Sequence, residues 1–515
     1  MFAMSNRQRA YTWLIRVLVP LVLLAACTPA PPSPTPVTDD GIRTITIFYT
    51  SDEHGYLEPL EKGSDTLGGA ANLLALLRQR GYDPDGPDGN DTLLLSGGDM
   101  WTGPAISSWF QGTSAVQVFN AMGYDAAAVG NHEFDFGREV LLTNGEAADF
   151  PLLTANTTLA GTGDPPGFAQ PYVMREVNGV QVGIVGLTTI RTPQIVMPAH
   201  VEGLVFGDYA DALRRVVPQA RAEGAELVIV IAHVCPSELR ALVPVAAELS
   251  IPLLAGGHCR MVENVELSGV RIIKPDEHWQ AFAQVDITFD TATGEVVSTQ
   301  AELVPVEYVT AAGNPVIPDA GIESLVAGWK AQVDEALGEV IGYTESGVEV
   351  NWPLYNLVVD AWLWTYPEAD LAINNLGGYR ETIPPGEITR ADVVATMPFE
   401  NTLVDVELTG QQVMDNLLCC GGAVAGLTYH RAGARIIAEL DDGSVLDPEA
   451  TYHALVNNFM YAGGDGYLFS TQDPDAYDTG IQWREPVIEW IIAQQTSPER
   501  PLERLLDDTK RGMGR

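Results

Sequence analysis

The chain has 515 residues, of which 46% are hydrophobic and 19% charged, so it is too long for one hydrophobic core and leaves room for two or three domains of roughly 100 to 200 residues. This composition is ordinary for a globular protein and excludes both wholesale disorder and a polytopic membrane protein. A net charge of -40, from 68 acidic and 28 basic residues, repels polyanions, so we expect no nucleic-acid polymer as a partner.

The first residues are typical of an export signal. An apolar run over 17–26 follows two arginines and is too short to span a bilayer. It ends in Leu-Ala-Ala-Cys, which resembles the bacterial lipobox, and this resemblance implies a signal peptide over 1–27 and lipid modification of Cys27. The Pro-rich segment at 28–42 is expected to be an extended linker. We therefore expect an extracytoplasmic lipoprotein of the cell envelope or periplasm, attached to the membrane by its lipid anchor.

From residue 43, short β-branched apolar runs alternate with helical patterns. Strands are expected at 44–50, 91–96, 126–129, 180–188, 226–233, 252–257 and 282–290, and helices at 71–81 and 114–123. Such alternation predicts a layered α/β domain, a sheet core with flanking helices, over 43–310.

The pattern changes near residue 311. A connecting helix is expected within 311–338, and a second α/β unit with its own core over 339–500. Its expected helices lie at 354–366 and 410–418, and its expected strands at 370–373, 402–408 and 452–459.

Side chains of the types that commonly bind metals lie at the ends of five of the expected strands. They are Asp52, His54, Asp99, Asn131, His132, His233 and His258. Because ligands in α/β sheets collect at the carboxyl ends of strands, five segments deliver these groups to one edge of the fold. Each residue alone would more often be a cap or turn residue, but four of the eight histidines fall at these points.

Carboxylate, imidazole and amide ligands suit Zn, Mn or similar divalent ions rather than a thiolate-rich structural zinc site. Two such ions bridged by one carboxylate can orient a phosphoryl group and lower the pKa of a bound water to about 7, which makes hydroxide available. Bound dications would also reverse the negative field locally and attract a small anionic substrate.

The motifs TSDEHG, SGGDMWTG, GNHEFDFG, IAH and GGH resemble those of the calcineurin-like metallophosphatases, specifically the 5'-nucleotidase family. The resemblance continues in NNLGGYR, MPFENT and AGGDGY and so covers nearly the whole mature chain. It implies the following metal ligands: Asp52 and His54 for one ion, Asp99 as the bridge, and Asn131, His233 and His258 for the other. It also implies that His132 and Asp135 are the catalytic pair, with Asp135 orienting an imidazole that stabilises or protonates the reacting oxygens.

The same resemblance implies that the second domain recognises a nucleotide. Phe399 and Phe459 would stack on the base, Asp465 would accept hydrogen bonds from the ribose, and Arg380 would face the phosphate. Asn375 is the remaining match among the substrate-binding positions. Each phenylalanine alone would more often be a core residue.

Two positions depart from the family pattern. Arg260 stands where the family has a further ligand of the first metal, and a guanidinium has no acceptor with which to bind a cation. The first site is therefore weaker, or is completed by another group, or Arg260 contacts substrate phosphate instead. The stretch around Val348 has no arginine where the family carries one. The sequence therefore supports hydrolysis better than it identifies the leaving group.

Four cysteines remain beyond Cys27. Cys235 and Cys259 flank the ligand candidates and could pair or approach a metal, although inert small side chains are the leading interpretation. No function is drawn from Cys419 and Cys420. Their pairing is left open.

The leading hypothesis is a two-metal enzyme, a 5'-nucleotidase that releases phosphate from nucleoside monophosphates. Alternatives on the same scaffold are a 2',3'-cyclic-nucleotide phosphodiesterase, a UDP-sugar diphosphatase and a thiosulfohydrolase. A noncatalytic nucleotide-binding lipoprotein would require a broken ligand set, and the intact set argues against it.

Overall fold

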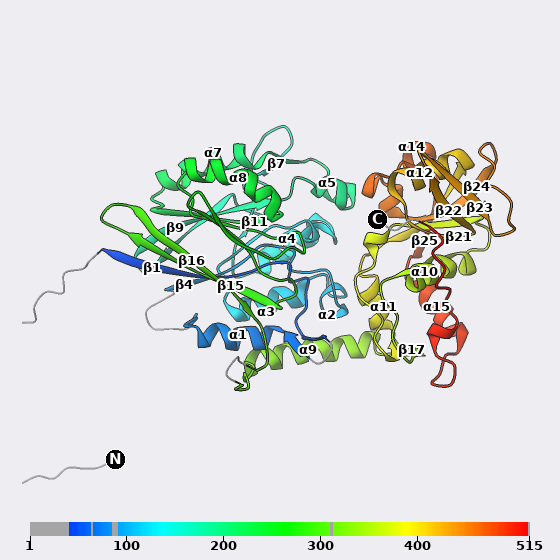
Figure 1. The fold of residues 1–515 in the computed structure, drawn as a ribbon, viewed down its shortest axis with the longest axis horizontal. Helices are drawn as coiled ribbons and strands as arrows, with labels where there is room; N and C mark the ends of the chain where they lie inside the picture. Colours follow the sequence, from blue (N-terminus) through cyan, green and yellow to red (C-terminus); the bar gives the residue numbers. More distant parts are fainter. Residues whose placement is uncertain (1–40, 63–64, 85–90, 310–312, 513–515) are drawn as a thin grey trace, which may run out of the picture. The chain divides into compact units, whose positions relative to one another are not determined.

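The computed structural model describes residues 41–62, 65–84, 91–309 and 313–512 (Figure 1). The predicted signal peptide, Cys27 and nearly all of the Pro-rich linker lie outside these residues. Within the described ranges, none of the helices combines the length and the apolar character needed to cross a bilayer.

The first sheet is built around the first strand of the chain. Its strands, in spatial order, are β16 (Glu295–Pro305), β15 (Ala281–Asp290), β1 (Ile42–Thr50), β4 (Thr92–Ser96), β5 (Ala126–Ala128) and β6 (Leu152–Leu153). β1, β4, β5 and β6 are mutually parallel, whereas β15 is antiparallel to both of its neighbours, β1 and β16. The carboxyl ends of β1, β4 and β5 therefore share one edge.

The second sheet has the same number of strands. Their order is β13 (Glu263–Leu267), β14 (Val270–Lys274), β12 (Leu253–Ala255), β11 (Leu227–His233), β9 (Val180–Thr188) and β8 (Tyr172–Val177). β14, β12, β11 and β9 are parallel to one another, so β11 and β12 also end on a common side.

The two sheets share one core. Ile45 and Ile47 of β1 cluster with Ile229 and Ile231 of β11, and all four side chains are buried. Helices cover the outer faces: α1 (Ala70–Gln79), α3 (Thr113–Met122) and α9 (Ala320–Leu337) pack on the first sheet, and α7 (Tyr209–Ala222) and α8 (Pro236–Glu248) on the second. Because β11 is buried on both faces, its sequence is a continuous apolar run.

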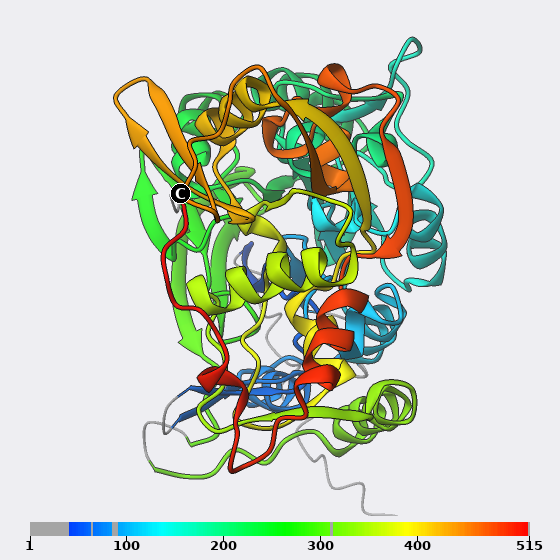
Figure 2. The same cartoon turned by 90° about the vertical axis from the view of Figure 1, so that its right-hand side faces the viewer.

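The third sheet forms the core of the C-terminal half. Its order is β21 (Ala423–Ala425), β18 (Leu371–Asn374), β24 (Thr451–Asn457), β20 (Thr402–Thr409) and β25 (Tyr477–Gln482). One face packs on α10 (Trp352–Thr365) and α15 (Glu485–Gln494), which lie in front in Figure 2, and the other on α12 (Gly410–Cys420) and the hairpin of β22 (Leu427–Ala432) and β23 (Arg435–Leu440). Alternate residues of β18 point to the two faces.

Shorter elements connect these layers. They are β2 (Pro59–Lys62), β3 (Asp65–Gly68), α2 (Ala105–Ser108), η1 (His132–Phe134), α4 (Arg138–Ala147), β7 (Thr157–Leu159), α5 (Thr192–Ile195), α6 (Pro198–Val201), β10 (Leu204–Phe206), β17 (Val340–Thr344), η2 (Leu376–Gly378), β19 (Gly386–Thr389), α11 (Arg390–Thr396), α13 (Asn458–Tyr461), η3 (Gly464–Gly466), α14 (Phe469–Gln472) and η4 (Leu502–Arg504).

The predicted fold class, a layered α/β domain followed by a second α/β domain, is confirmed. The doubling of the sheet in the first half was not predicted, because apolar runs show which strands are buried but not which sheet each strand joins. The domain boundaries at residues 310 and 338 stay predictions.

Candidate metal centre and substrate pocket

The ends of five strands from both sheets meet at one place. Asp52 and His54 follow β1, Asp99 follows β4, Asn131 and His132 follow β5, His233 ends β11 and His258 follows β12. Two hydrogen bonds hold the sheet ends together: the hydroxyl of Tyr49 donates to the carbonyl of Gly256 at 2.9 Å, and Nδ1 of His233 donates to the carbonyl of Gly97 at 3.0 Å.

Asp99 lies at the centre of this cluster. Its Oδ2 lies 2.9 Å from His233 Nε2, 3.8 Å from His54 Nε2 and 4.0 Å from His132 Nε2. Burial alone would raise the pKa of Asp99, but the surrounding imidazoles hold it well below its ordinary value. The carboxylate is thus ionised and shared between two groups of nitrogens, the position of a bridging ligand.

Asp99, His233 and His258 form one group whose donor atoms lie within 4.8 Å of one another. Nδ1 of His233 donates to a backbone carbonyl, so Nε2 is the nitrogen that faces Asp99 and would bind an ion. Burial, together with His233, lowers the pKa of His258 to about 3, which keeps its imidazole neutral. The Oδ1 of Asn131 is buried and accepts no hydrogen bond from the described residues. These four residues fit a divalent cation.

His54, Asp99 and His132 form the other group of closely placed donor atoms. Nδ1 of His54 donates to the carbonyl of Thr102 at 3.1 Å, which again leaves Nε2 for an ion. Asp52 is held by two contacts of its own carboxylate oxygens. Its Oδ1 accepts a hydrogen bond from the His258 amide at 2.8 Å, and its Oδ2 lies 3.2 Å from the Nζ of the fully buried Lys274.

Several of these side chains are carried on strained backbone. Asp52, His54, Asp99 and His258 have positive φ angles of 55°, 50°, 58° and 71°. Non-glycine residues adopt this region infrequently, and they persist there where the surrounding structure enforces it, commonly at functional sites. In the second domain Asp465 does the same, with φ 55°.

Three buried residues of this region were missed by the sequence analysis. Glu133 accepts hydrogen bonds from the amides of Gly130, Asp99 and Met100 at 2.5, 2.9 and 2.8 Å. Glu53 accepts hydrogen bonds from two hydroxyls, and Lys274 pairs with Asp52. Their only signal in the sequence is a charge beside a motif residue or at the end of an apolar strand.

His132 joins the two halves of the site. Its Nδ1 lies 2.6 Å from Asp135 Oδ2, and its Nε2 lies 2.7 Å from Nη2 of Arg380. Because a guanidinium only donates, Nε2 accepts this bond and Nδ1 carries the proton shared with Asp135. Arg380 also lies 5.2 Å over the ring of Phe399, which stacks near His132 with ring centroids 6.1 Å apart.

One cavity of about 620 Å³ contains both sets of predicted residues. Those lining it are Asp52, His54, Asp99, Asn131, His132, Asp135, His258, Asn375, Arg380, Phe399, Phe459 and Asp465. His233 lies behind the wall, fully buried against Asp99. In the second domain, Asn375 Nδ2 donates to Asp465 Oδ2 at 2.9 Å, and Asn457 Nδ2 donates to Asn375 Oδ1 at 3.0 Å. This chain of amides fixes Asp465 at the cavity wall.

The two positions that differ from the family pattern, Arg260 and Val348, lie in different surroundings. Arg260 lines the cavity with a largely exposed side chain and lies 3.6 Å from Glu277. Val348 is buried in the core of the second domain and bridges to Ile383, so that position does not face the cavity.

The four cysteines of the described chain form two disulfides, Cys235 with Cys259 and Cys419 with Cys420. The interpretation of Cys235 and Cys259 as inert small side chains is therefore wrong. Spacing along the chain could not reveal the pair, because the folding of β11 and β12 brings the cysteines together.

Comparison with known proteins gives consistent results. Residues 339–471 match the family described as 5'-nucleotidase, C-terminal domain. The 5'-nucleotidase of Vibrio cholerae is 27% identical over 91% of this chain and 94% of its own length. Endonuclease YhcR of Bacillus subtilis is 28% identical over 72% of this chain, which spans 33% of that longer protein. The crystal structure of the 5'-nucleotidase precursor from Thermus thermophilus superposes with a TM-score of 0.75 at 25% identity, over 91% of this chain and 98% of that one.

Proposed function

Because this chain belongs to the 5'-nucleotidase family of phosphoester hydrolases, we propose that it releases inorganic phosphate from nucleoside monophosphates. The observation that carries this proposal is the single cavity lined both by the Asp99 cluster and by the aromatic and polar side chains of the C-terminal half. A phosphate bound at the cluster would leave an attached nucleoside near Phe399, Phe459 and Asp465, which line the same cavity.

Two divalent ions, Zn or Mn, are the cofactors that this ligand set fits best. Asn131, His233 and His258 would hold one ion, Asp52 and His54 the other, and Asp99 both. When bound, such ions polarise phosphoryl oxygens and lower the pKa of water. His54 and His233 each direct Nε2 into the cluster because Nδ1 donates to a carbonyl.

His132, Asp135 and Arg380 handle the phosphoryl group. With Asp135 fixing Nδ1, the Nε2 of His132 faces Arg380 at the cavity wall and would lie beside a bound phosphoryl group. Arg380 is partly buried, and its Nε atom is buried with no hydrogen-bond partner among the described residues. In the complex the guanidinium would donate to phosphate oxygens, which frees His132 Nε2 to stabilise or protonate the leaving oxygen.

The C-terminal residues recognise the nucleoside. Phe399 and Phe459 would stack on the base, a contact worth roughly 1 to 3 kcal/mol per base. Asp465, which Asn375 holds at the cavity wall, would accept hydrogen bonds from ribose hydroxyls. This arrangement distinguishes a nucleotide from a simple phosphate ester.

We also propose that the enzyme lies outside the cytoplasm, attached to the membrane by a lipid. An export signal ending at a lipid-modified Cys27 would hold the enzyme on the outer side of the cytoplasmic membrane or in the periplasm. Mass spectrometry of the mature N-terminus tests this part. A diacylglyceryl-modified Cys27 is expected, and an unprocessed Met1 would contradict the anchor.

The enzymatic proposal is tested with the full chain supplied with Mn²⁺ or Zn²⁺ and offered AMP, cyclic AMP and UDP-glucose in parallel. Metal-dependent release of phosphate from AMP is expected to exceed turnover of the other two. Cleavage of cyclic AMP or UDP-glucose without turnover of AMP would contradict the proposed substrate and favour a diesterase on the same scaffold.

A further inference from the structure

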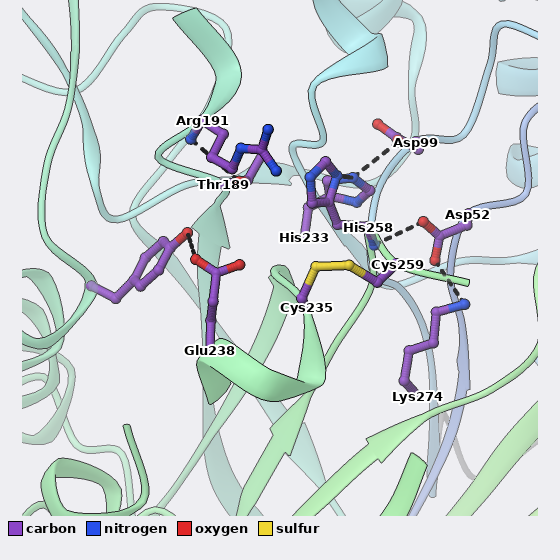
Figure 3. The surroundings of a disulfide bond; sticks show 11 residues. Asp52, Asp99, Thr189, Arg191, His233, Cys235, Glu238, His258, Cys259 and Lys274 are labelled. Atoms are coloured by element: carbon purple, nitrogen blue, oxygen red, sulfur yellow. Dashed lines mark hydrogen bonds and ion pairs between the residues drawn. A yellow bond between two sulfur atoms is a disulfide. The ribbon is translucent and has the colours of Figure 1, made fainter. Parts of the chain in front are cut away.

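The Cys235–Cys259 disulfide joins two segments that each carry a residue of the metal cluster. Cys235 stands two residues after His233, at the start of α8, and Cys259 directly follows His258. The Cα atoms of the two cysteines lie 5.2 Å apart. In Figure 3 the disulfide lies beside the two imidazoles, with Asp99 and Asp52 beyond them.

The disulfide lies where the sheet no longer holds these segments together. The last ladder pair of β11 and β12 is Ile231 with Ala255. Past it, the amide of Gly257 donates to the carbonyl of Val234 at 3.2 Å. A covalent bond beyond that point limits how far the two imidazoles can move apart.

The segment that holds His258 also needs such a constraint. His258 has a φ of 71°, and the amide of Cys259 donates to the carbonyl of Gly257 at 2.9 Å in a tight turn. Nδ1 of His258 lies 3.2 Å from Nε2 of His233. Strained backbone persists when its surroundings enforce it, and the neighbouring disulfide and the bond from the His258 amide to Asp52 do so.

We propose that the Cys235–Cys259 disulfide is a positioning element of the metal site, which holds His233 and His258 at the spacing that one ion requires. This inference rests on the proposed function for the presence of the ion. Breaking the disulfide weakens the binding of the ion held by His233 and His258, because the free segments spend less time in the binding geometry.

A dithiol reductant can break this bond. Cys235 is buried and Cys259 is partly exposed, so a reductant thiolate attacks Sγ of Cys259 and expels Cys235 as a thiolate, which takes up a proton. The second thiol of the reductant then attacks the mixed disulfide, releases Cys259 and leaves the reductant as a cyclic disulfide. Two electrons pass to the protein, and two cysteine thiols form.

The test compares the full chain with the double variant Cys235→Ala/Cys259→Ala. The matched control is Cys419→Ala/Cys420→Ala, which removes the other disulfide. Each protein is stripped of metal, and its affinity for Zn²⁺ is measured by competition with a chromogenic chelator. We expect the first variant to bind one ion about 10- to 100-fold more weakly and to recover AMP turnover at high metal concentration, as for the loss of other groups that orient ligands. The control should bind metal as the parent does.

Unchanged affinity for both ions in Cys235→Ala/Cys259→Ala would overturn the proposal. If that variant does not fold, the Cys419→Ala/Cys420→Ala protein is reduced with dithiothreitol, desalted without oxygen and titrated in the same way. Weaker binding after reduction supports the proposal, and equal binding overturns it. Free thiols from Cys235 and Cys259 in the untreated, denatured control protein would also overturn it. The readout is metal affinity, so an absence of AMP turnover with normal metal binding would count against the proposed function alone.

Discussion

At the scale of single residues, the cluster depends on groups that never touch substrate. Glu133 accepts hydrogen bonds from three backbone amides, two of which belong to Asp99 and Met100. It therefore fixes the segment that presents the Asp99 carboxylate. Burial, and the negative charge of Asp99, raise the pKa of Glu133 to about 7.

Replacing Glu133 with alanine should destabilise the protein. The substitution leaves buried amides without an acceptor, and each such group costs about 1–3 kcal/mol. We expect the free energy of unfolding in urea to fall by about 3 kcal/mol or more, with less effect from Glu133→Gln, which keeps one acceptor oxygen. Glu139→Ala on the exposed start of α4 is the control. A Glu133→Ala protein as stable as this control would contradict the assigned role.

Glu53 gives a pH-dependent prediction. Burial raises its pKa from 4.5 to about 8, although hydroxyls of Thr50 and Ser96 donate to it. Between these values the folded protein keeps a proton that the unfolded chain has lost, so the unfolding free energy falls as the pH rises, by up to about 1.4 kcal/mol per pH unit. Glu53→Gln has no such proton, and its stability should fall less steeply from about pH 5.5 to about pH 7.5 in urea melts. Parallel pH profiles would show that Glu53 is ionised when folded.

The sequence was sufficient to predict which side chains meet in the candidate metal cluster. Asp52 and Asp99 come shortly after apolar strands and His233 ends one, so the sequence alone indicates that these side chains lie at strand ends. Glu133 and Lys274 could not be assigned in this way, because their role lies in contacts with backbone amides or with a carboxylate from a distant segment.

At the scale of elements, the packing of η3 against α13 sets the position of Phe459 in the cavity wall. A Cβ atom on Gly464 would lie 2.3 Å from Cε2 and 2.4 Å from Cζ of Phe459. Gly464→Ala should therefore displace the ring and raise KM for AMP by about tenfold, with a smaller change in kcat, because a stacking contact is worth roughly 1 to 3 kcal/mol.

Gly328→Ala in α9 is the matched control, since no atom lies within 4 Å of the added Cβ. Steady-state kinetics with AMP separates the two variants. An unchanged KM in Gly464→Ala would contradict the proposed stacking of Phe459 on the base.

Elements with strong patterns were predicted best. The expected strands at 180–188 and 226–233 correspond to β9 (Val180–Thr188) and β11 (Leu227–His233). The hairpin of β22 and β23 and the edge strand β8 were missed, because their partly exposed faces carry charged residues that weaken the apolar signal.

At the scale of the whole molecule, catalysis as proposed needs both halves of the chain. Arg380 and His132 are 248 positions apart in sequence and meet at 2.7 Å. Arg380→Met should lower kcat/KM for AMP by about 10²–10³, as for the loss of other groups that stabilise developing charge. Metal affinity, measured in parallel, should not change. If kcat/KM of Arg380→Met equals that of the parent, Arg380 does not contact the phosphate.

In the proposed function, Asp99 joins the metal cluster to phosphate release. The most direct measurement is metal content and AMP turnover of Asp99→Asn beside the parent chain under identical conditions. We predict that the variant loses bound metal and that its phosphate release becomes undetectable, since the amide lacks the charge that a bridging ligand provides. An Asp99→Asn protein that keeps its metal and hydrolyses AMP at the parental rate would contradict the account.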